Sequence, residues 1–482
     1  MHLDNPKLLL DSGWINGREA VAERRFAVTN PATQEAIASV SDLDASHAAA
    51  AIAAASTALR EWRARPLAER AGLVLRWGEL IESNAADLAA IICCESGKPL
   101  REARSEAFQC AALLRWYAQE VQRLHGETLP ANAPGQRNCT IKQPIGVVGC
   151  ITPWNFPAAA VVVKAGAAIV TGCTVVAKPS DETPLIALAI ARLAADAGLP
   201  GGVFNVLPCK DPTAVGGELC RSPEVRMLSF TGSTSVGRQL YKACGDTVKR
   251  LALELGGNAP FIVFDDADLE MAVDGAVGAR FYNSGQICVG ANRFFVHSKV
   301  YEEFSEALAA RVRNMRPGDG FDEASDIGPM INRAAIERLS GLVASASQMG
   351  ARVLAGGGQD DADTLFFQPT VLTRMTKAMP AYTTEIFGPV ACLYGFDGDQ
   401  EVLELANDTH AGLAAYVYSG STARLARFVE ALEAGVVGAN TVGIFSNDLP
   451  FGGIKQSGIG REHGLHCLDE YVETKSVCIG LQ

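Results

Sequence analysis

Three side chains with the chemistry of a covalent catalyst occur in separate segments of this sequence. Cys288 ends the segment Phe-Tyr-Asn-Ser-Gly-Gln-Ile-Cys, Glu254 closely precedes a pair of glycines, and Asn155 lies in Pro-Trp-Asn-Phe-Pro. A thiol can act as a nucleophile, a carboxylate can activate water, and an amide N–H can stabilise an oxyanion. Together they form the minimum set for a reaction that passes through a covalent thioester.

Each of these residues also has an ordinary structural interpretation. The chain has 13 cysteines, most of which must be small buried side chains, so a single thiol is more often inert than reactive. Glu254 is also consistent with an ion pair at the end of a strand, and Asn155 with a turn. The histidines are scattered along the chain. They leave a cysteine hydrolase open as an alternative, because catalytic triads assemble in space, although nothing singles out one histidine as a partner.

Length and composition restrict the class of protein. The chain has 482 residues, 48% of them hydrophobic, which is typical of a globular protein with about three domains. The net charge of −12 disfavours nucleic acid or an anionic membrane as the partner. The cysteines form no CxxC motif and no zinc-type cluster, which predicts no metal site and a reducing, cytoplasmic location.

The most apolar stretch of the chain, residues 158–177, is interrupted by Lys164. A lysine near the centre of a membrane-spanning helix is costly, so the stretch is predicted to be a buried helix followed by a buried strand. The first residues lack the basic and apolar regions of a signal peptide. The sequence therefore predicts neither a membrane span nor a secretory leader.

Alternating strands and helices dominate the chain after a helical N-terminal third. The N-terminal helices are predicted at 45–58, 68–82, 85–96 and 101–123. The first alternating block has strands at 174–178, 203–207, 225–230 and 251–253, with helices at 183–197, 212–220 and 231–243. The second has strands at 261–264, 293–296, 391–396 and 413–418, with helices at 268–280, 300–313, 333–348 and 422–432. Such alternation predicts parallel sheets and an α/β fold.

A last strand is predicted at 470–479, with no helix after it. A lone terminal strand needs an edge to pair with, and another subunit could supply that edge. This strand predicts a homo-oligomer, either a homodimer or a homotetramer.

Two segments at the ends of predicted strands have the character of a nucleotide site. Residues 232–237 follow a strand and open a helix, whose first backbone N–H groups favour a phosphate. Lys178 and Asp181 follow another strand of the same sheet, where the acid could accept hydrogen bonds from ribose hydroxyls. The alternatives are an ordinary capped turn for the first segment and a solvated charge pair for the second.

Taken together, these segments resemble the aldehyde dehydrogenase superfamily over nearly the whole chain. The matching segments, in order, are 153–157, 178–181, 230–233, 254–257, 285–288, 385–389 and 450–458. Residues 205–209 and 469–471 look most like the succinate-semialdehyde dehydrogenase subgroup. The resemblance implies a Rossmann-like cofactor domain, an α/β catalytic domain and a small β oligomerisation arm. The expected boundaries are 1–122 and 146–252 for the cofactor domain, 253–452 for the catalytic domain, and 123–145 and 466–482 for the arm.

The resemblance also implies a reaction, the oxidation of a small-molecule aldehyde to a carboxylic acid. The Cys288 thiolate would attack the carbonyl, and the Asn155 amide and the Cys288 backbone N–H would stabilise the oxyanion. Hydride would pass to the nicotinamide of the cofactor and leave a thioester. Glu254 would then activate the water that hydrolyses it.

The same resemblance assigns residues to the cofactor, which is expected to be NAD. Lys178 and Asp181 would hold the adenosine ribose, Ser233 the pyrophosphate and Glu385 the nicotinamide ribose, with Phe387 near the ring. The other cofactor-binding residues that the match implies are Trp154, Ser180, Gly232 and Leu255. The Asp181 carboxylate would repel a 2′-phosphate, so NAD is expected to be preferred. Aspartate is shorter than the glutamate often found there, so NADP remains possible.

Three positions of the expected substrate pocket depart from the succinate-semialdehyde subgroup. Where that subgroup holds the substrate carboxylate with two arginines and a serine, this chain has Val163, Tyr282 and Phe445. A carboxylate buried against such residues would lose its hydration without compensation. An apolar or aromatic aldehyde is therefore the expected substrate. The alternative is succinate semialdehyde, with the carboxylate held by another residue: the candidates are Arg280, Arg293 and Ser446.

Overall fold

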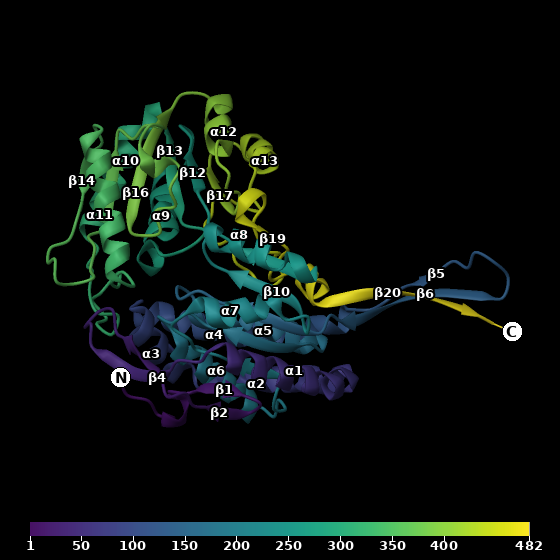
Figure 1. Ribbon diagram of the computed structural model, residues 1–482. Helices are drawn as coiled ribbons and strands as arrows, with labels where there is room; N and C mark the ends of the chain where they lie inside the picture. The colour runs from purple at the N-terminus through teal and green to yellow at the C-terminus, as the bar shows by residue number, and fades with distance from the viewer. Residues whose placement is uncertain (482) are drawn as a thin grey trace.

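The computed structural model describes residues 1–481, which form two large sheets covered by helices and a narrow arm that projects from the body (Figure 1). A separate two-stranded ribbon pairs β3 (Arg25–Thr29) with β4 (Ala36–Ser41). No helix in the described range is long and apolar enough to cross a membrane. The α/β fold with parallel sheets is as predicted.

The first sheet has eight strands in the order β19-β11-β10-β7-β8-β9-β1-β2. Their bounds are β19 Gly458–Ile459, β11 Arg250–Glu254, β10 Val225–Thr231, β7 Val147–Ile151, β8 Thr174–Lys178, β9 Phe204–Val206, β1 Gly13–Ile15 and β2 Arg18–Ala20. The strands from β11 to β9 are parallel. The register places Ile151 opposite Lys178, and Thr231 opposite Glu254. The carboxyl ends of these strands therefore bring the nucleotide segments and Glu254 to one edge of the sheet.

The second sheet has seven strands in the order β14-β15-β16-β13-β12-β17-β18. Their bounds are β14 Arg352–Ala355, β15 Thr370–Thr373, β16 Val390–Phe396, β13 Ala291–His297, β12 Ala259–Val263, β17 Ala414–Tyr418 and β18 Val436–Ala439. Every pair except β14 with β15 is parallel. Cys288 lies just before β13, so this sheet positions the predicted nucleophile.

Helices flank both sheets (Figure 1). Those of the first half are α1 Ala45–Ala64, α2 Leu67–Ser83, α3 Ala85–Ser96, α4 Leu100–Glu120, α5 Pro157–Thr171, α6 Pro184–Asp196, α7 Pro212–Arg221 and α8 Thr234–Ala243. Those of the second half are α9 Leu269–Phe281, α10 Tyr301–Arg313, α11 Arg333–Gln348, α12 Asp399–Asn407 and α13 Thr422–Ala431. The helix predicted at 101–123 ends as an α-helix at Glu120 and continues as a 3₁₀ turn.

The helix α5 and the strand β8 account for the apolar stretch 158–177. Pro157 occupies the first turn, where its missing N–H is not needed, and Gly172 ends the helix in the left-handed region with φ of 104°. Almost every side chain of α5 is buried, including Lys164. The buried helix and strand are as predicted.

The arm is a three-stranded antiparallel sheet of β20 (Val472–Gly480), β6 (Gln136–Pro144) and β5 (Thr128–Leu129). The terminal strand pairs with β6 along its whole length, from Val472 opposite Pro144 to Gly480 opposite Gln136. The edge that the terminal strand needs is thus supplied within its own chain. The arm extends away from the body in Figure 1 and carries exposed apolar side chains, among them Ile141 and Ile479.

Candidate active site

One cavity of about 990 Å³ contains most of the residues that the sequence singles out. Its lining includes the three predicted catalytic residues Cys288, Glu254 and Asn155. It also includes most of the other predicted cofactor and substrate residues: Trp154, Gly232, Ser233, Leu255, Glu385, Phe387, Val163, Tyr282 and Phe445. Lys178, Ser180 and Asp181 lie outside this lining. The fold therefore brings segments from both sheets to one site.

A left-handed turn presents Cys288 to the cavity. After α9, the residues Asn283, Ser284 and Gly285 have φ values of 49°, 56° and 71°. At Gly285 a Cβ atom would lie 2.3 Å from the carbonyl oxygen of Gly388, so only glycine fits. Two consecutive left-handed residues with side chains are costly and need support from their surroundings. The buried hydrogen bonds of this turn provide that support.

Asn155, in the loop that follows β7, is held in a defined orientation by hydrogen bonds to this turn. Its side-chain Nδ2 donates to the carbonyl oxygen of Gln286 at 3.0 Å, and its own carbonyl oxygen accepts from Lys98 Nζ at 2.7 Å and from Asn283 Nδ2 at 2.9 Å. A primary amide has two N–H donors. One N–H is therefore engaged by the loop that carries Cys288, and the second remains for an oxyanion.

Glu254 ends β11 and is buried in the cavity wall. Its Oε2 has no hydrogen-bond partner among the described residues. Burial raises the pKa of this carboxyl well above its usual range, the nearby Glu462 raises the pKa further, and Lys164 and Arg461 oppose the shift. A carboxyl with an open oxygen and a raised pKa is suited to take a proton from a water.

A buried ion pair that the sequence did not predict lies beside Glu254. Lys164 Nζ in α5 donates to Glu462 Oε1, and the exposed fractions of the two side chains are 0% and 13%. The two residues are far apart in the sequence, so no local motif connects them. The one sequence feature that could have indicated the pair was Lys164 itself, because a charge inside an apolar helix needs a buried counter-ion.

A second buried ion pair supports Asn155. Lys98 Nζ and Glu106 Oε2 lie 2.6 Å apart, with both side chains 1% exposed. The other oxygen of Glu106 accepts from the backbone N–H groups of Ala158 and Ala159, at 2.9 and 3.0 Å. These N–H groups belong to the first turn of α5, which has no side-chain cap of its own. The pair therefore fixes the start of α5 and the loop before it.

Cys288 is protonated in the surroundings that these residues create. Burial raises the pKa of its thiol, and the carboxyl groups of Glu385 and Glu254 raise the pKa further. The thiol therefore needs either a base to accept its proton or a positive charge nearby before it becomes a strong nucleophile. Glu254 lines the same cavity and is suited to the first role.

The pyrophosphate segment has the geometry of an anion site at a helix start. Ser233 is the N-cap of α8 and accepts from the N–H of Val236 at 3.3 Å. The N–H of Gly232 donates to the Glu254 carbonyl oxygen at 3.0 Å, which joins this turn to the strand that carries the base. Because Ser233 lines the cavity, the turn fits a phosphate group.

Glu385 and two aromatic rings form another part of the cavity wall. Glu385 Oε1 accepts from the Gly257 N–H at 3.0 Å, and burial raises the pKa of this carboxyl to about 7. The rings of Trp154 and Phe387 are in edge-to-face contact, with centroids 5.6 Å apart. A carboxyl beside flat apolar surfaces fits a ribose and its base, so the residues present are compatible with a dinucleotide.

The predicted adenosine-ribose residues lie beyond the cavity at the end of β8. Lys178 Nζ donates to the Pro179 carbonyl oxygen at 3.0 Å, and Ser180 Oγ accepts from the N–H of Glu182 at 3.3 Å. Asp181 Oδ2 lies 2.6 Å from Lys210 Nζ. The sequence did not predict this last contact, since Lys210 comes from the next strand connection.

The substrate end of the cavity is mainly aromatic and aliphatic. Phe445 stacks on Phe451 with centroids 4.9 Å apart, and Tyr282 stacks on Phe156 at 6.2 Å. Polar side chains also reach this end: Ser105, Gln109, Ser446, Asn447 and His463. The Ser446 hydroxyl donates to Asp448, whereas the buried Nδ1 of His463 has no partner among the described residues.

Two arginines considered for a substrate carboxylate are engaged elsewhere. Arg280 donates to the carbonyl oxygen of Ala291 and to the Asn292 side chain, at 3.0 and 2.9 Å. Arg293 donates to the carbonyl oxygens of Asn258 and Ala406. Both are fully buried and neither lines the cavity. The prediction that either could hold the carboxylate is wrong, because their donors are engaged inside the protein: Arg280 also donates to the Gly285 carbonyl oxygen of the catalytic turn, and Arg293 also donates to the Leu405 carbonyl oxygen.

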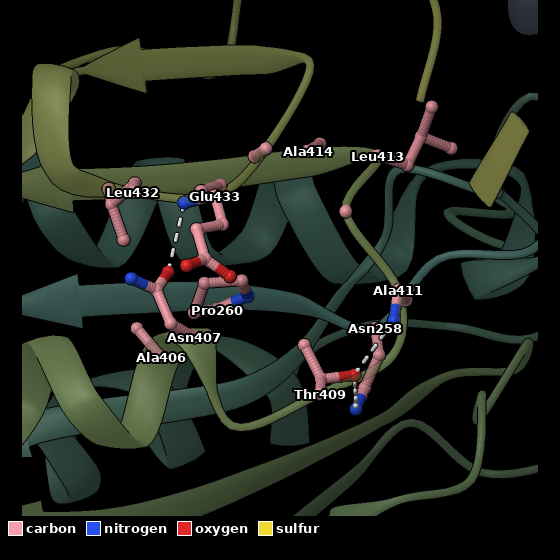
Figure 2. Close-up of a pocket in the computed structure, with 13 residues that line it drawn as sticks. Asn258, Pro260, Ala406, Asn407, Thr409, Ala411, Leu413, Ala414, Leu432 and Glu433 are labelled. Atoms are coloured by element: carbon pink, nitrogen blue, oxygen red, sulfur yellow. Dashed lines mark hydrogen bonds between the residues drawn. The ribbon is translucent and has the colours of Figure 1, made fainter. Parts of the chain in front are cut away.

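A much smaller hollow near Asn258 and Asn407 carries no site (Figure 2). Its volume is about 10 Å³, room for a single water. The polar groups there are paired with each other: Asn258 Nδ2 donates to Thr409, and the Glu433 N–H donates to Asn407 (Figure 2). Residues 1–481 also contain no cluster of acidic, His or Cys side chains that could hold a metal ion.

The comparisons with known proteins agree with this geometry. The sequence model of the aldehyde dehydrogenase family matches residues 14–477. The chain belongs to this family. A probable succinate-semialdehyde dehydrogenase [NADP(+)] of Sinorhizobium fredii is 50% identical over 95% of this chain and 93% of its own length. A glutarate-semialdehyde dehydrogenase of Pseudomonas putida is 45% identical over 100% of both chains.

Solved structures of aldehyde dehydrogenases have the same fold. The crystal structure of a succinate-semialdehyde dehydrogenase from Burkholderia pseudomallei superimposes with a TM-score of 0.98, at 45% identity and with 100% of both chains covered. This aldehyde dehydrogenase is thus an oxidoreductase, similar to semialdehyde dehydrogenases along its entire length.

Proposed function

We propose that this aldehyde dehydrogenase oxidises a semialdehyde with a terminal carboxylate to the dicarboxylic acid, with NAD⁺ or NADP⁺ as the oxidant. The observation that carries the proposal is that Cys288, Asn155 and Glu254 meet in one cavity. The relatives named for succinate and glutarate semialdehyde, at 50% and 45% identity, support the substrate class. The name of the first relative supports the use of NADP⁺.

The side chains divide the reaction between them. Glu254 accepts the thiol proton, and the Cys288 sulfur adds to the aldehyde carbon. The free N–H of Asn155 and the backbone N–H of Cys288 donate to the oxygen that becomes negative. The bound dinucleotide supplies the acceptor for the hydride of the former aldehyde carbon. Loss of this hydride leaves a thioester on Cys288. Glu254 first passes the thiol proton to solvent and then takes a proton from water, whose oxygen attacks the thioester carbon. The carbon–sulfur bond breaks, and the acid leaves.

The cofactor is proposed to lie along the edge where the strands of the first sheet end. Ser233 would hold the pyrophosphate at the start of α8, Glu385 the nicotinamide ribose, and Asp181 with Lys178 the adenosine ribose. Trp154, Ser180, Gly232, Leu255 and Phe387 would complete the contacts. The proposed domains are 1–122 with 146–252 for the cofactor, 253–452 for catalysis, and 123–145 with 466–482 for the arm.

A substrate carboxylate needs a polar group at the apolar end of the cavity. His463 lines the cavity and offers a buried Nδ1 that has no hydrogen-bond partner among the described residues. Burial lowers the pKa of this imidazole, Lys164 lowers it further, and Glu462 opposes the shift, so the ring is neutral at pH 7. A neutral imidazole still donates one hydrogen bond. We propose that His463 donates it to the substrate carboxylate.

The apolar lining favours a second candidate substrate, an apolar or aromatic aldehyde. Val163, Tyr282 and Phe445 line this end and offer no charge to an anion. The measurement that separates the two is kcat/KM for succinate semialdehyde, for butanal as its uncharged counterpart, and for benzaldehyde. We expect succinate semialdehyde to have the highest value, and His463→Leu to lower that value without changing the value for butanal. A higher value for benzaldehyde would contradict the proposal.

The projecting arm supports a homo-oligomer, either a dimer or a dimer of dimers. An isolated three-stranded sheet with exposed Ile141 and Ile479 has too little core to be stable alone. We propose that the arm packs on a second copy of this chain. Light scattering of the intact protein at micromolar concentration should give a dimer or tetramer, and a stable active monomer would contradict the proposal.

A further inference from the structure

Asp181 and Lys210 form an ion pair at the proposed ribose site. Asp181 follows β8 and Lys210 follows β9, and these two strands are neighbours in the first sheet. The distance between Asp181 Oδ2 and Lys210 Nζ is 2.6 Å, and the exposed fractions of the two side chains are 29% and 58%. The carboxylate proposed to select the cofactor is therefore not a bare negative charge.

The other charged groups near the pair are already engaged. Lys178 is buried and donates to the Pro179 carbonyl oxygen. Asp42 pairs with Arg24 at 2.8 Å and also accepts from the Lys210 backbone N–H. Glu182 accepts from Asn332.

Lys210 remains charged in these surroundings. Its hydrogen bond to Asp181 raises the pKa of the ammonium, the carboxylates of Asp181, Glu182 and Asp42 raise it further, and burial opposes the shift. Lys210 is therefore an exposed cation beside the proposed ribose site.

A cation at this position changes what the ribose site can accept. An unpaired carboxylate accepts hydrogen bonds from the 2′- and 3′-hydroxyls of an adenosine ribose and repels a 2′-phosphate. With Lys210 in place, the local charge of the pair is zero. An exposed ion pair contributes little to stability, and a lysine stem is flexible, so the ammonium can turn from Asp181 to a phosphate at small cost.

We propose that Lys210 is a specificity-determining residue that receives the 2′-phosphate of NADP⁺, and that this enzyme consequently uses NADP⁺ as well as NAD⁺. In the NAD⁺ complex Lys210 stays with Asp181, which accepts the ribose hydroxyls. In the NADP⁺ complex the ammonium contacts the 2′-phosphate and screens it from Asp181. The inference rests on the proposed function, because that function places the adenosine ribose at the end of β8.

Calorimetric titration of the intact enzyme with NADP⁺ and with NAD⁺ tests the proposal without measuring turnover. In Lys210→Met the loss of one charge-assisted contact should raise the Kd for NADP⁺ by about tenfold or more. The Kd for NAD⁺ should change far less. The matched control is Lys377→Met, which breaks another exposed pair, Lys377 with Asp408 at 3.0 Å, and should change neither value.

A second variant keeps the proposal testable if Lys210→Met does not fold. Asp181→Asn removes the negative charge and keeps the size, so NADP⁺ should bind more tightly and NAD⁺ more weakly. An unchanged ratio of the two Kd values in Lys210→Met would overturn the proposal. A wild-type enzyme that binds NAD⁺ but not NADP⁺ would also overturn it and leave the proposed function intact, whereas binding of neither dinucleotide would refute both.

Discussion

The amide of Asn155 is joined to the backbone carbonyl of Gln286 by a 3.0 Å hydrogen bond, two residues before Cys288. This bond connects the loop that follows β7 with the turn that precedes β13, and so connects the two large sheets at the site. Any movement of the Cys288 turn therefore moves the proposed oxyanion donor with it. The relative position of nucleophile and donor is fixed before an aldehyde arrives, which is the condition for effective electrostatic stabilisation.

Asn155→Ala should lower kcat by about 10²–10³, the usual cost of losing one oxyanion donor. Binding of the dinucleotide should change little, because Asn155 is not proposed to contact it. Single-turnover kinetics and calorimetry on the same preparation check the two parts. A variant with normal kcat would show that another group stabilises the oxyanion.

The kcat of the wild-type enzyme should fall as the pH is lowered. The fall should begin at a pH above the range in which an ordinary carboxylic acid takes up its proton. Glu254 works only when ionised, and burial together with Glu462 raises its pKa. Protonation of Glu254 therefore begins at a higher pH than for a solvated glutamate, and the acid side of the kcat profile should follow it. A profile that stays flat down to pH 5 would contradict Glu254 as the base.

Substitutions in the buried Lys164–Glu462 pair should shift the acid limb, which is the acid side of the kcat–pH profile. The shifts should be in opposite directions for the two residues. Lys164→Met removes a positive charge that lowers the pKa of Glu254, so the limb should shift to higher pH. Glu462→Gln removes a negative charge that raises this pKa, so the limb should shift to lower pH. Circular dichroism serves as the control for folding. Equal shifts in the same direction would mean that the variants act through structure and not through charge.

The ion pair between Lys98 and Glu106, which supports the Asn155 carbonyl, should contribute to the stability of the fold. Removing one partner of a fully buried pair typically costs about 3–5 kcal/mol, because the other charge is left without compensation. Lys98→Met should therefore lower the free energy of unfolding by about that amount. The double variant Lys98→Met with Glu106→Leu should lose less than the sum of the two single changes, which denaturant titration can measure. Additive losses would show that the two side chains do not act as a pair.

Much of the fold could be predicted because it is encoded locally. The strand at 174–178 has its predicted bounds, since five buried residues between clear breaks leave little choice. The strand β7 was not predicted, although it is central to the first sheet: Val147–Ile151 is a run of only five residues with Gly149 at its centre, and glycine weakens the strand pattern. The pairing of β20 with β6 depends on residues more than 300 positions apart, which no periodicity records.

In the candidate site, too, local motifs could be predicted and contacts between distant segments could not. Motifs predicted Cys288, Glu254 and Asn155, because their neighbouring glycines and prolines are contiguous in the sequence. The partners that tune them come from distant segments and appear only after folding, as the Lys164–Glu462 pair beside Glu254 shows. The expectation for Arg280 failed for a related reason: whether an arginine is free depends on the backbone carbonyls that surround it.

Mass spectrometry of the Glu254→Gln enzyme tests the central claim most directly. This variant keeps Cys288 and Asn155, but it cannot activate the hydrolytic water and leaves the Cys288 proton to a solvent base. Mixed with succinate semialdehyde and a saturating concentration of NADP⁺ or NAD⁺, it should release one reduced dinucleotide per site, more slowly than the wild-type enzyme, and then stop. Peptide mapping should locate a succinyl group on Cys288. Steady turnover without an adduct, or an acyl group on another cysteine, would contradict the account.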